Sequence, residues 1–287
     1  MRAVISYLKM IKIEHSLFAL PFALSATVLA AKGVPSIYTL FWVVFCMVAA
    51  RSGAMGFNRW ADATIDAKNP RTATREIPKG TISKNSAFIF VVVSFALFMA
   101  GAYMLNFLSF ALSPIIIGIF ILYSYTKRFT SLCHLVLGVA LGVSPLAAWV
   151  AVTGSFNTSI IYMGVAVVLW CAGFDLFYAL QDMEFDKEEG LHSFPARFGT
   201  INTMITARYM HLVAFILFFI HGAMFAMGLI YFAGLVISGA MLLYEHYLVS
   251  KYGIAKLDKA FFNMNAAVSV ILFVATILDL AVYGFRA

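Results

Sequence analysis

The chain has 287 residues, 63% of them hydrophobic and only 11% charged, with a mean hydropathy of +0.92 and a formal net charge of +7. A soluble domain of this size does not need so much apolar material, so the composition predicts an all-α polytopic membrane protein. An outer-membrane barrel is disfavoured, because its strands would show short alternating patterns. The apolar runs here are continuous and about 20 residues long, enough to cross a ~30 Å hydrocarbon core.

Nine apolar segments follow one another without a linker or low-complexity stretch between them. We expect residues 1–287 to form a single membrane domain, with about nine transmembrane helices arranged as a ring around a central cavity. The first segment is basic and then apolar, like a signal peptide, but Glu14 and His15 interrupt its basic region and we expect it to be retained. The predicted spans are 16–31, 37–57, 86–105, 108–125, 133–152, 159–180, 205–225, 228–248 and 264–284.

Basic residues fall almost entirely on one side of this arrangement. With a cytoplasmic N-terminus, 18 of the 20 Lys and Arg residues face the cytoplasm, and only Lys32 and Arg286 face outward. The positive-inside rule therefore predicts a bacterial-type inner (plasma) membrane protein with its long loops in the cytoplasm and its C-terminus outside. The basic residues are dispersed among loops rather than gathered in one tract, so nucleic acid is not an expected partner.

Asn58, Asp62 and Asp66, in the segment NRWADATID, follow one another at four-residue spacing at the inner end of the second span. At 100° per residue each step turns by about 40°, so one helix would carry all three on a single stripe. Two carboxylates this close repel each other, which favours a cation between them. Oxygen ligands of this kind suit Mg²⁺ held jointly with a substrate's phosphates, so we predict a metal site.

A basic tract follows this stripe and contains Lys68, Arg71, Arg75 and Lys79. Arg and Lys neutralise and hydrogen-bond the phosphate oxygens that a metal leaves uncovered. An ordinary positive-inside loop would explain the basic residues but not the carboxylates beside them. The combination favours a diphosphate site.

Two further basic positions are candidates for the same site. Arg51 lies inside the second span, seven residues before Asn58, on the same helical face. It either extends to the inner interface or binds a substrate carboxylate, and its direction toward the stripe favours the second role. Lys127 and Arg128 follow the aromatic run Tyr123–Tyr125 and are either phosphate ligands or topology anchors, with Lys127 the stronger candidate.

A second acidic stripe, formed by Asp175, Tyr178, Asp182 and Asp186, ends the sixth span and again falls on one helical face. Asp175 lies inside the apolar run VLWCAGFDLFYAL, where a carboxylate is costly unless it is paired or bound to metal, so it is a functional candidate. Tyr178 is placed to hydrogen-bond a phosphate or an acceptor hydroxyl. Acidic stripes after spans two and six, with basic loops after spans four and eight, form a weak four-helix repeat. Unless the similarity arose by chance, it would set the two stripes opposite each other.

The cysteines and histidines show no metal-ligand spacing. Cys46, Cys133 and Cys171 lie singly in apolar runs and are expected to pack. His15 and His192 border inner loops and stay open as candidates, while two further histidines (His211 and His221) are expected to pack between helices.

Three segments together resemble the UbiA superfamily of intramembrane aromatic prenyltransferases: Asn58-x-x-x-Asp62-x-x-x-Asp66 with the following RTATREIPKG, then DLFYALQDMEFD, and the opening IEHSLFALPFALSA. The resemblance covers nearly the whole chain and is closest to the 4-hydroxybenzoate polyprenyltransferases of ubiquinone synthesis. The segment NRWADATIDAKNPRTATRE looks more like a sister group that prenylates a dihydroxynaphthoate in the futalosine route to menaquinone. Glu76, where many relatives have proline, leaves the subfamily open.

The resemblance implies roles for individual residues. Asn58, Asp62 and Asp66 would hold one Mg²⁺, and Asp182 and Asp186 a second. Arg71, Arg75 and Lys127 would contact the diphosphate, while Arg51 and Asp175 would lie nearer the acceptor. The implied reaction transfers a polyprenyl group from a polyprenyl diphosphate to a small aromatic acid within the lipid bilayer.

Two alternatives remain at this stage. Haem O and chlorophyll synthases share the diphosphate chemistry of the superfamily but use other acceptors. A cation- or proton-coupled transporter would use Asp175 and Arg51 along a pathway, but it predicts acids near the middle of the membrane rather than at the inner face.

Overall fold

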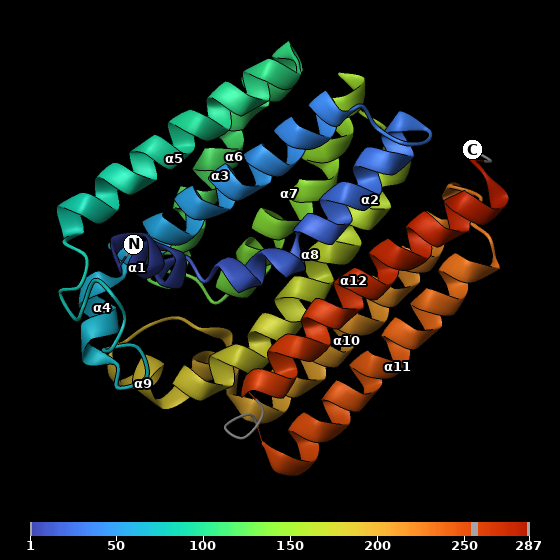
Figure 1. The fold of residues 1–287 in the computed structure, drawn as a ribbon. Coiled ribbons are helices and arrows are strands. Elements are labelled where there is room, and N and C mark those ends of the chain that lie inside the picture. Colours follow the sequence, from blue (N-terminus) through green and yellow to red (C-terminus); the bar gives the residue numbers. More distant parts are fainter. Residues whose placement is uncertain (1, 254–257, 286–287) are drawn as a thin grey trace.

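The computed structural model describes residues 2–253 and 258–285, and this part of the chain is helical with no strand (Figure 1). The elements are α1 (Arg2–Met10), η1 (Ile13–Phe18), α2 (Leu20–Ala31), α3 (Ile37–Ala61), α4 (Ala63–Lys68), α5 (Lys84–Leu105), α6 (Phe107–Thr126), α7 (Cys133–Thr153), α8 (Thr158–Ala179), η2 (Leu180–Asp182), α9 (Met183–Glu188), α10 (Phe194–Met224), α11 (Leu229–Tyr252) and α12 (Asp258–Tyr283).

The number of spans agrees with the sequence. Within the described residues, eight helices are long and apolar enough to cross a membrane, and a bent pair, Val4–Phe18 with Leu20–Ala31, would make a ninth. The all-α polytopic prediction is therefore confirmed. Lys256 and Arg286, which entered the charge count, lie outside the described residues.

Short polar segments separate the spans, and their side chains begin several of the helices. Ser36, Ser83 and Asn106 each accept a hydrogen bond from a main-chain N–H three residues later, at 3.1, 3.1 and 2.8 Å. These bonds satisfy N–H groups that the first turn of a helix leaves without a partner. Satisfying them matters more beside a bilayer, where water does not reach the hydrocarbon region.

The cavity expected at the centre of the helix ring lies in one half of the bundle. Helices α2, α3, α5, α6 and α7 surround an apolar cavity. On the other side of α2 and α7, helices α8, α10, α11 and α12 pack against each other around large buried side chains such as Phe22, Trp170, Phe218 and Tyr231. The first half of the bundle is therefore hollow, while the second half is filled.

Glycines allow α7 and α8 to approach closely. A Cβ atom at Gly138 would collide with the carbonyl oxygen of Val168, and one at Gly142 with the Val168 side chain and the carbonyl oxygen of Gly164. Small residues at such contacts are the usual means of packing membrane helices, because lipid supplies no hydrophobic driving force between them.

Several boundaries differ from the sequence-based expectation. The first span is bent by 49° between η1 and α2, and α10 begins at Phe194 rather than near 205, with a break at Gly199 (φ 76°). The second acidic stripe does not lie on one continuous α-helix, because the chain tightens into the 3₁₀ turn η2 after Ala179. The assumption of 100° per residue fails there, since a 3₁₀ turn rotates more per residue.

Replacing Gly138 by Ala should lower the free energy of unfolding of the purified protein in detergent by roughly 1–3 kcal/mol, because the new methyl group would collide with backbone atoms of α8. The loss should appear as a lower unfolding temperature. Gly118→Ala on α6 is the matched control, since a Cβ there meets nothing within 4 Å. Equal unfolding temperatures for the two variants would contradict the close α7–α8 contact.

Candidate active site

A polar cavity of about 300 Å³ is lined by most of the predicted site residues, including residues of α4 and α9. These two short helices lie at one end of the bundle (Figure 1). The cavity brings the two acidic stripes together, as the four-helix repeat predicts. The predicted residues that line it are His15, Arg51, Asn58, Asp62, Asp66, Arg71, Arg75, Lys127, Arg128, Asp175, Tyr178 and Asp182.

The first stripe stays on one side of this cavity although its helix is interrupted. α3 ends at Ala61 and α4 begins at Ala63, but the N–H of Asp62 still donates to the carbonyl of Asn58 (3.0 Å), and that of Asp66 to the carbonyl of Asp62 (2.8 Å). The i to i−4 bonding therefore continues across the junction, which keeps the three side chains in order.

Basic side chains neutralise both carboxylates of the first stripe. Arg128 donates to Asp62 at 3.0 Å, and Arg75 donates to Asp66 at 2.6 Å. Burial raises the pKa of Asp62 above its ordinary range, the hydrogen bond from Arg128 opposes that shift, and the charge of Asp66 adds to it. Additional positive charge beside Asp62 would stabilise the ionised form of its carboxyl group.

The second stripe is tied to loops from the first half of the chain. Asp182 accepts hydrogen bonds from Asn69 (2.9 Å) and from both Nε (2.9 Å) and Nη2 of Arg71. Asp186 is fully buried and pairs with Lys127 at 2.7 Å. These contacts fold the basic tract over the cavity and join segments more than 50 residues apart in the sequence.

The oxygen donors fit a divalent cation shared with a substrate. Asp66 Oδ2 and Asp186 Oδ2 are buried and have no hydrogen-bond partner among the described residues. No group of three His, Cys, Asp or Glu side chains in the described part of the chain is placed to hold a metal alone. Carboxylates divided between two stripes suit Mg²⁺, which binds to one or two protein carboxylates and completes its coordination with water and phosphate oxygens.

Four of the candidates, Lys68, Lys79, Asp186 and His192, lie outside the cavity lining. The side chain of Lys68 is 61% exposed and pairs with Glu189 at 2.6 Å, so its contact holds α4 to the segment after α9. Asp186 lies behind Lys127 rather than on the cavity surface.

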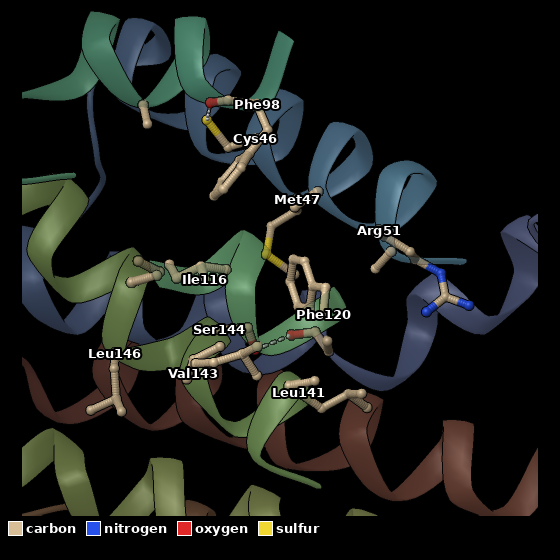
Figure 2. Close-up of a pocket in the computed structure, with 18 of the residues that line it drawn as sticks. Cys46, Met47, Arg51, Phe98, Ile116, Phe120, Leu141, Val143, Ser144 and Leu146 are labelled. Carbon is tan, nitrogen blue, oxygen red and sulfur yellow. Dashed lines mark hydrogen bonds between the residues drawn. The ribbon is translucent and has the colours of Figure 1, made fainter. Parts of the chain in front are cut away.

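An apolar cavity of about 340 Å³ adjoins the polar one. Both are lined by Arg51, Met55, Asn58 and Tyr123. Figure 2 shows the guanidinium of Arg51 at one margin, with Met47, Phe120 and other apolar side chains beyond it. Arg51 Nη2 also donates to the carbonyl of Lys12 at 3.4 Å. Arg51 therefore marks the boundary between a charged compartment and an apolar one.

Asp175 has a partner that the sequence did not reveal. His134 Nδ1 lies 2.6 Å from Asp175 Oδ2, and both residues line the polar cavity. The sequence held one signal for this histidine: it begins the span directly after the basic loop of Lys127 and Arg128. That position places it at the same membrane boundary as the two stripes.

Comparison with known proteins identifies the family of the chain. The profile of the UbiA prenyltransferase family matches residues 19–267. The 4-hydroxybenzoate octaprenyltransferase of Shewanella woodyi is 32% identical over 256 residues, covering 89% of this chain and 89% of that protein. The 4-hydroxybenzoate octaprenyltransferase of Pectobacterium carotovorum is 29% identical over 279 residues, covering 96% of each.

Solved structures show the same fold. A UbiA homologue from Aeropyrum pernix K1 matches with a TM-score of 0.85 at 30% identity, covering 93% of this chain and 98% of that one. A UbiA homologue from Archaeoglobus fulgidus bound to GPP and Mg²⁺ matches with a TM-score of 0.73 at 18% identity, covering 96% and 99%. The protein is thus a member of the UbiA prenyltransferase family, a polytopic membrane enzyme that transfers polyprenyl groups.

Proposed function

We propose that this enzyme, as one domain of residues 1–287, transfers a polyprenyl group from a polyprenyl diphosphate to an aromatic acid, either 4-hydroxybenzoate or a dihydroxynaphthoate. The observation that carries the proposal is the junction of two unlike cavities. One is lined by acidic stripes and basic side chains, the other is apolar, and Arg51 and Tyr123 belong to both. A polyprenyl diphosphate has a charged diphosphate that suits the polar cavity and a long isoprenoid chain that suits the apolar one.

The diphosphate half of the site rests on the two stripes. Asn58, Asp62 and Asp66 would hold one Mg²⁺, and the pair Asp182 and Asp186 a second. Bound Mg²⁺ supplies positive charge that stabilises the departing diphosphate. The unpartnered Oδ2 of Asp66, a residue that lines the cavity, supports this assignment, as does the Mg²⁺ bound to the Archaeoglobus homologue, although that chain is similar in fold alone.

The basic residues would bind the diphosphate directly. Arg71, Arg75 and Lys127 each pair with a carboxylate of a stripe. In the complex they would exchange these partners for phosphate oxygens, which lets them neutralise charge as it develops on the leaving group. Lys68 would act from the rim, where it holds α4 against Glu189.

The acceptor half would be built around Arg51 and Asp175. Arg51 would bind the carboxylate of the aromatic acid, while Asp175 and Tyr178 would face the ring hydroxyl. The allylic C–O bond ionises, the ring carbon attacks the allylic carbon, and loss of the ring proton restores aromaticity. Tyr123 lies at the junction of the cavities, where an aromatic ring stabilises nearby positive charge.

The isoprenoid would lie in the apolar cavity, where burial stabilises it by about 0.8 kcal/mol per CH₂ group. We place the polar cavity and the N-terminus on the cytoplasmic side, because the basic residues gather there. The names of the similar proteins favour 4-hydroxybenzoate and a role in ubiquinone synthesis, while the segment around Asn58 favours the menaquinone route. A transporter is the weaker alternative, since the acids cluster at one end of the bundle.

The purified enzyme with Mg²⁺ and a polyprenyl diphosphate should prenylate one member of a panel of aromatic acids and release pyrophosphate. EDTA should stop the reaction, and added Mg²⁺ should restore it. Mass spectrometry of the products identifies the acceptor. A folded protein that releases no pyrophosphate with any acid of the panel would refute the proposal.

Asp62→Ala should lower kcat/KM by about 100-fold or more, because it removes a proposed metal ligand. Glu184→Ala is the matched control: Glu184 is an exposed acid near the same end of the bundle, paired only with Lys187 among the described residues. Steady-state rates at saturating Mg²⁺, with unfolding temperatures for both variants, provide the measurement. Full activity of folded Asp62→Ala would remove Asp62 from the metal site.

Arg51→Met should raise the KM for the aromatic acid by roughly 10- to 100-fold, the loss expected when a charged hydrogen bond is removed. The KM for the diphosphate should change little. Arg208→Met is the control, since Arg208 donates to Ser250 and neither residue lines either cavity. An equal loss for both substrates would argue that Arg51 serves the diphosphate instead.

A further inference from the structure

His134 joins three helices at the edge of the polar cavity. It is the second residue of α7, and its side chain is only 8% exposed. Its Nδ1 lies 2.6 Å from Asp175 Oδ2 on α8, and the main-chain N–H of Phe194, the first residue of α10, donates to its Nε2 at 3.4 Å. Contacts on both ring nitrogens leave the imidazole little freedom to rotate.

These contacts assign the roles of the two nitrogens. Because Nε2 accepts a hydrogen bond from a main-chain N–H, the ring proton of the neutral histidine lies on Nδ1. The short contact is then a hydrogen bond that His134 donates to Asp175. A carboxylate held in this way has one oxygen occupied and one oriented oxygen left for another donor.

The remaining oxygen of Asp175 is available to a ligand in the cavity. The Asp175 side chain is 25% exposed, and it shares the polar cavity with Arg51, Tyr123 and Tyr178. Arg51 supplies a positive group to this cavity and Asp175 a negative one. The pair suits a ligand that accepts hydrogen bonds at one end and donates one at another. An aromatic acid with a ring hydroxyl has both.

We propose that His134 is a positioning residue for the aromatic acceptor, fixing Asp175 so that its Oδ1 accepts a hydrogen bond from the ring hydroxyl while Arg51 binds the carboxylate. The inference rests on the proposed function. The hydrogen bond to Asp175 draws the hydroxyl proton away from its oxygen, which raises electron density on the ring carbon beside it. That carbon is then the better nucleophile and is held in one orientation.

Two amide substitutions separate this role from simple packing. The side-chain nitrogen of Asn can take the place of Nδ1, whereas that of Gln extends toward the place of Nε2. His134→Asn should keep kcat/KM for 4-hydroxybenzoate within about 3-fold of the unmodified enzyme, while His134→Gln should lower it by at least about 10-fold. The KM for the polyprenyl diphosphate should stay within about 2-fold in both.

Benzoate, which lacks the ring hydroxyl, tests the contact itself. Its inhibition constant should be the same for the unmodified enzyme and both variants, because Asp175 has no hydroxyl to bind. A double-mutant cycle gives a measurement that does not depend on perfect folding of one variant: in the Asp175→Asn background, His134→Gln should cause no further loss of kcat/KM.

The outcomes are distinct. Equal losses for His134→Asn and His134→Gln, weaker inhibition by benzoate in the Gln variant, or additive losses in the cycle would each overturn the positioning role while leaving the proposed function intact. If the unmodified, folded enzyme prenylates no aromatic acid, the proposed function itself fails, and this inference fails with it.

Discussion

The need to neutralise charge at a membrane boundary organises this molecule. Four carboxylates stand at the same end of the helix bundle, and each is paired with a basic residue from a loop: Asp62 with Arg128, Asp66 with Arg75, Asp182 with Arg71, and Asp186 with Lys127. Ions removed from water are destabilised unless they are paired, so the loops fold over the cavity rather than extending into solvent. The position of the basic tract and the alignment of the two stripes follow from this requirement.

The division between hollow and filled halves gives the enzyme both its cavity and its rigidity. Aromatic side chains fill the space among α8, α10, α11 and α12, whereas the helices around the apolar cavity leave it open. Interiors packed at crystal-like density deform little, so the filled half can hold Asp175 and Asp182 in place beside the open half. Arg51 stands where the two environments meet.

Much of the site could be predicted because its signals are local. Asn58, Asp62 and Asp66 have helical spacing, and Asp175 is a charge inside an apolar run; both patterns are visible without a structure. His134 could not be assigned, because its meaning comes from a residue 41 positions away on another helix. The 3₁₀ turn at η2 and the pairing of Lys68 with Glu189 cannot be predicted for a related reason, because no periodicity in the sequence encodes either one. The spans can be predicted from the sequence because a bilayer imposes length and composition on each of them; the described residues hold eight, and a bent pair would make a ninth.

The glycine contact between α7 and α8 reaches beyond local packing. Helices are stiff over a few turns, so the separation fixed at Gly138 and Val168 is transmitted along both rods. His134 lies one turn from Gly138, and Asp175 lies about two turns from Val168. The close helix contact at Gly138 therefore influences the distance between His134 and Asp175. A methyl group added at this contact would change the distance between His134 and Asp175, although Gly138 itself lines neither cavity.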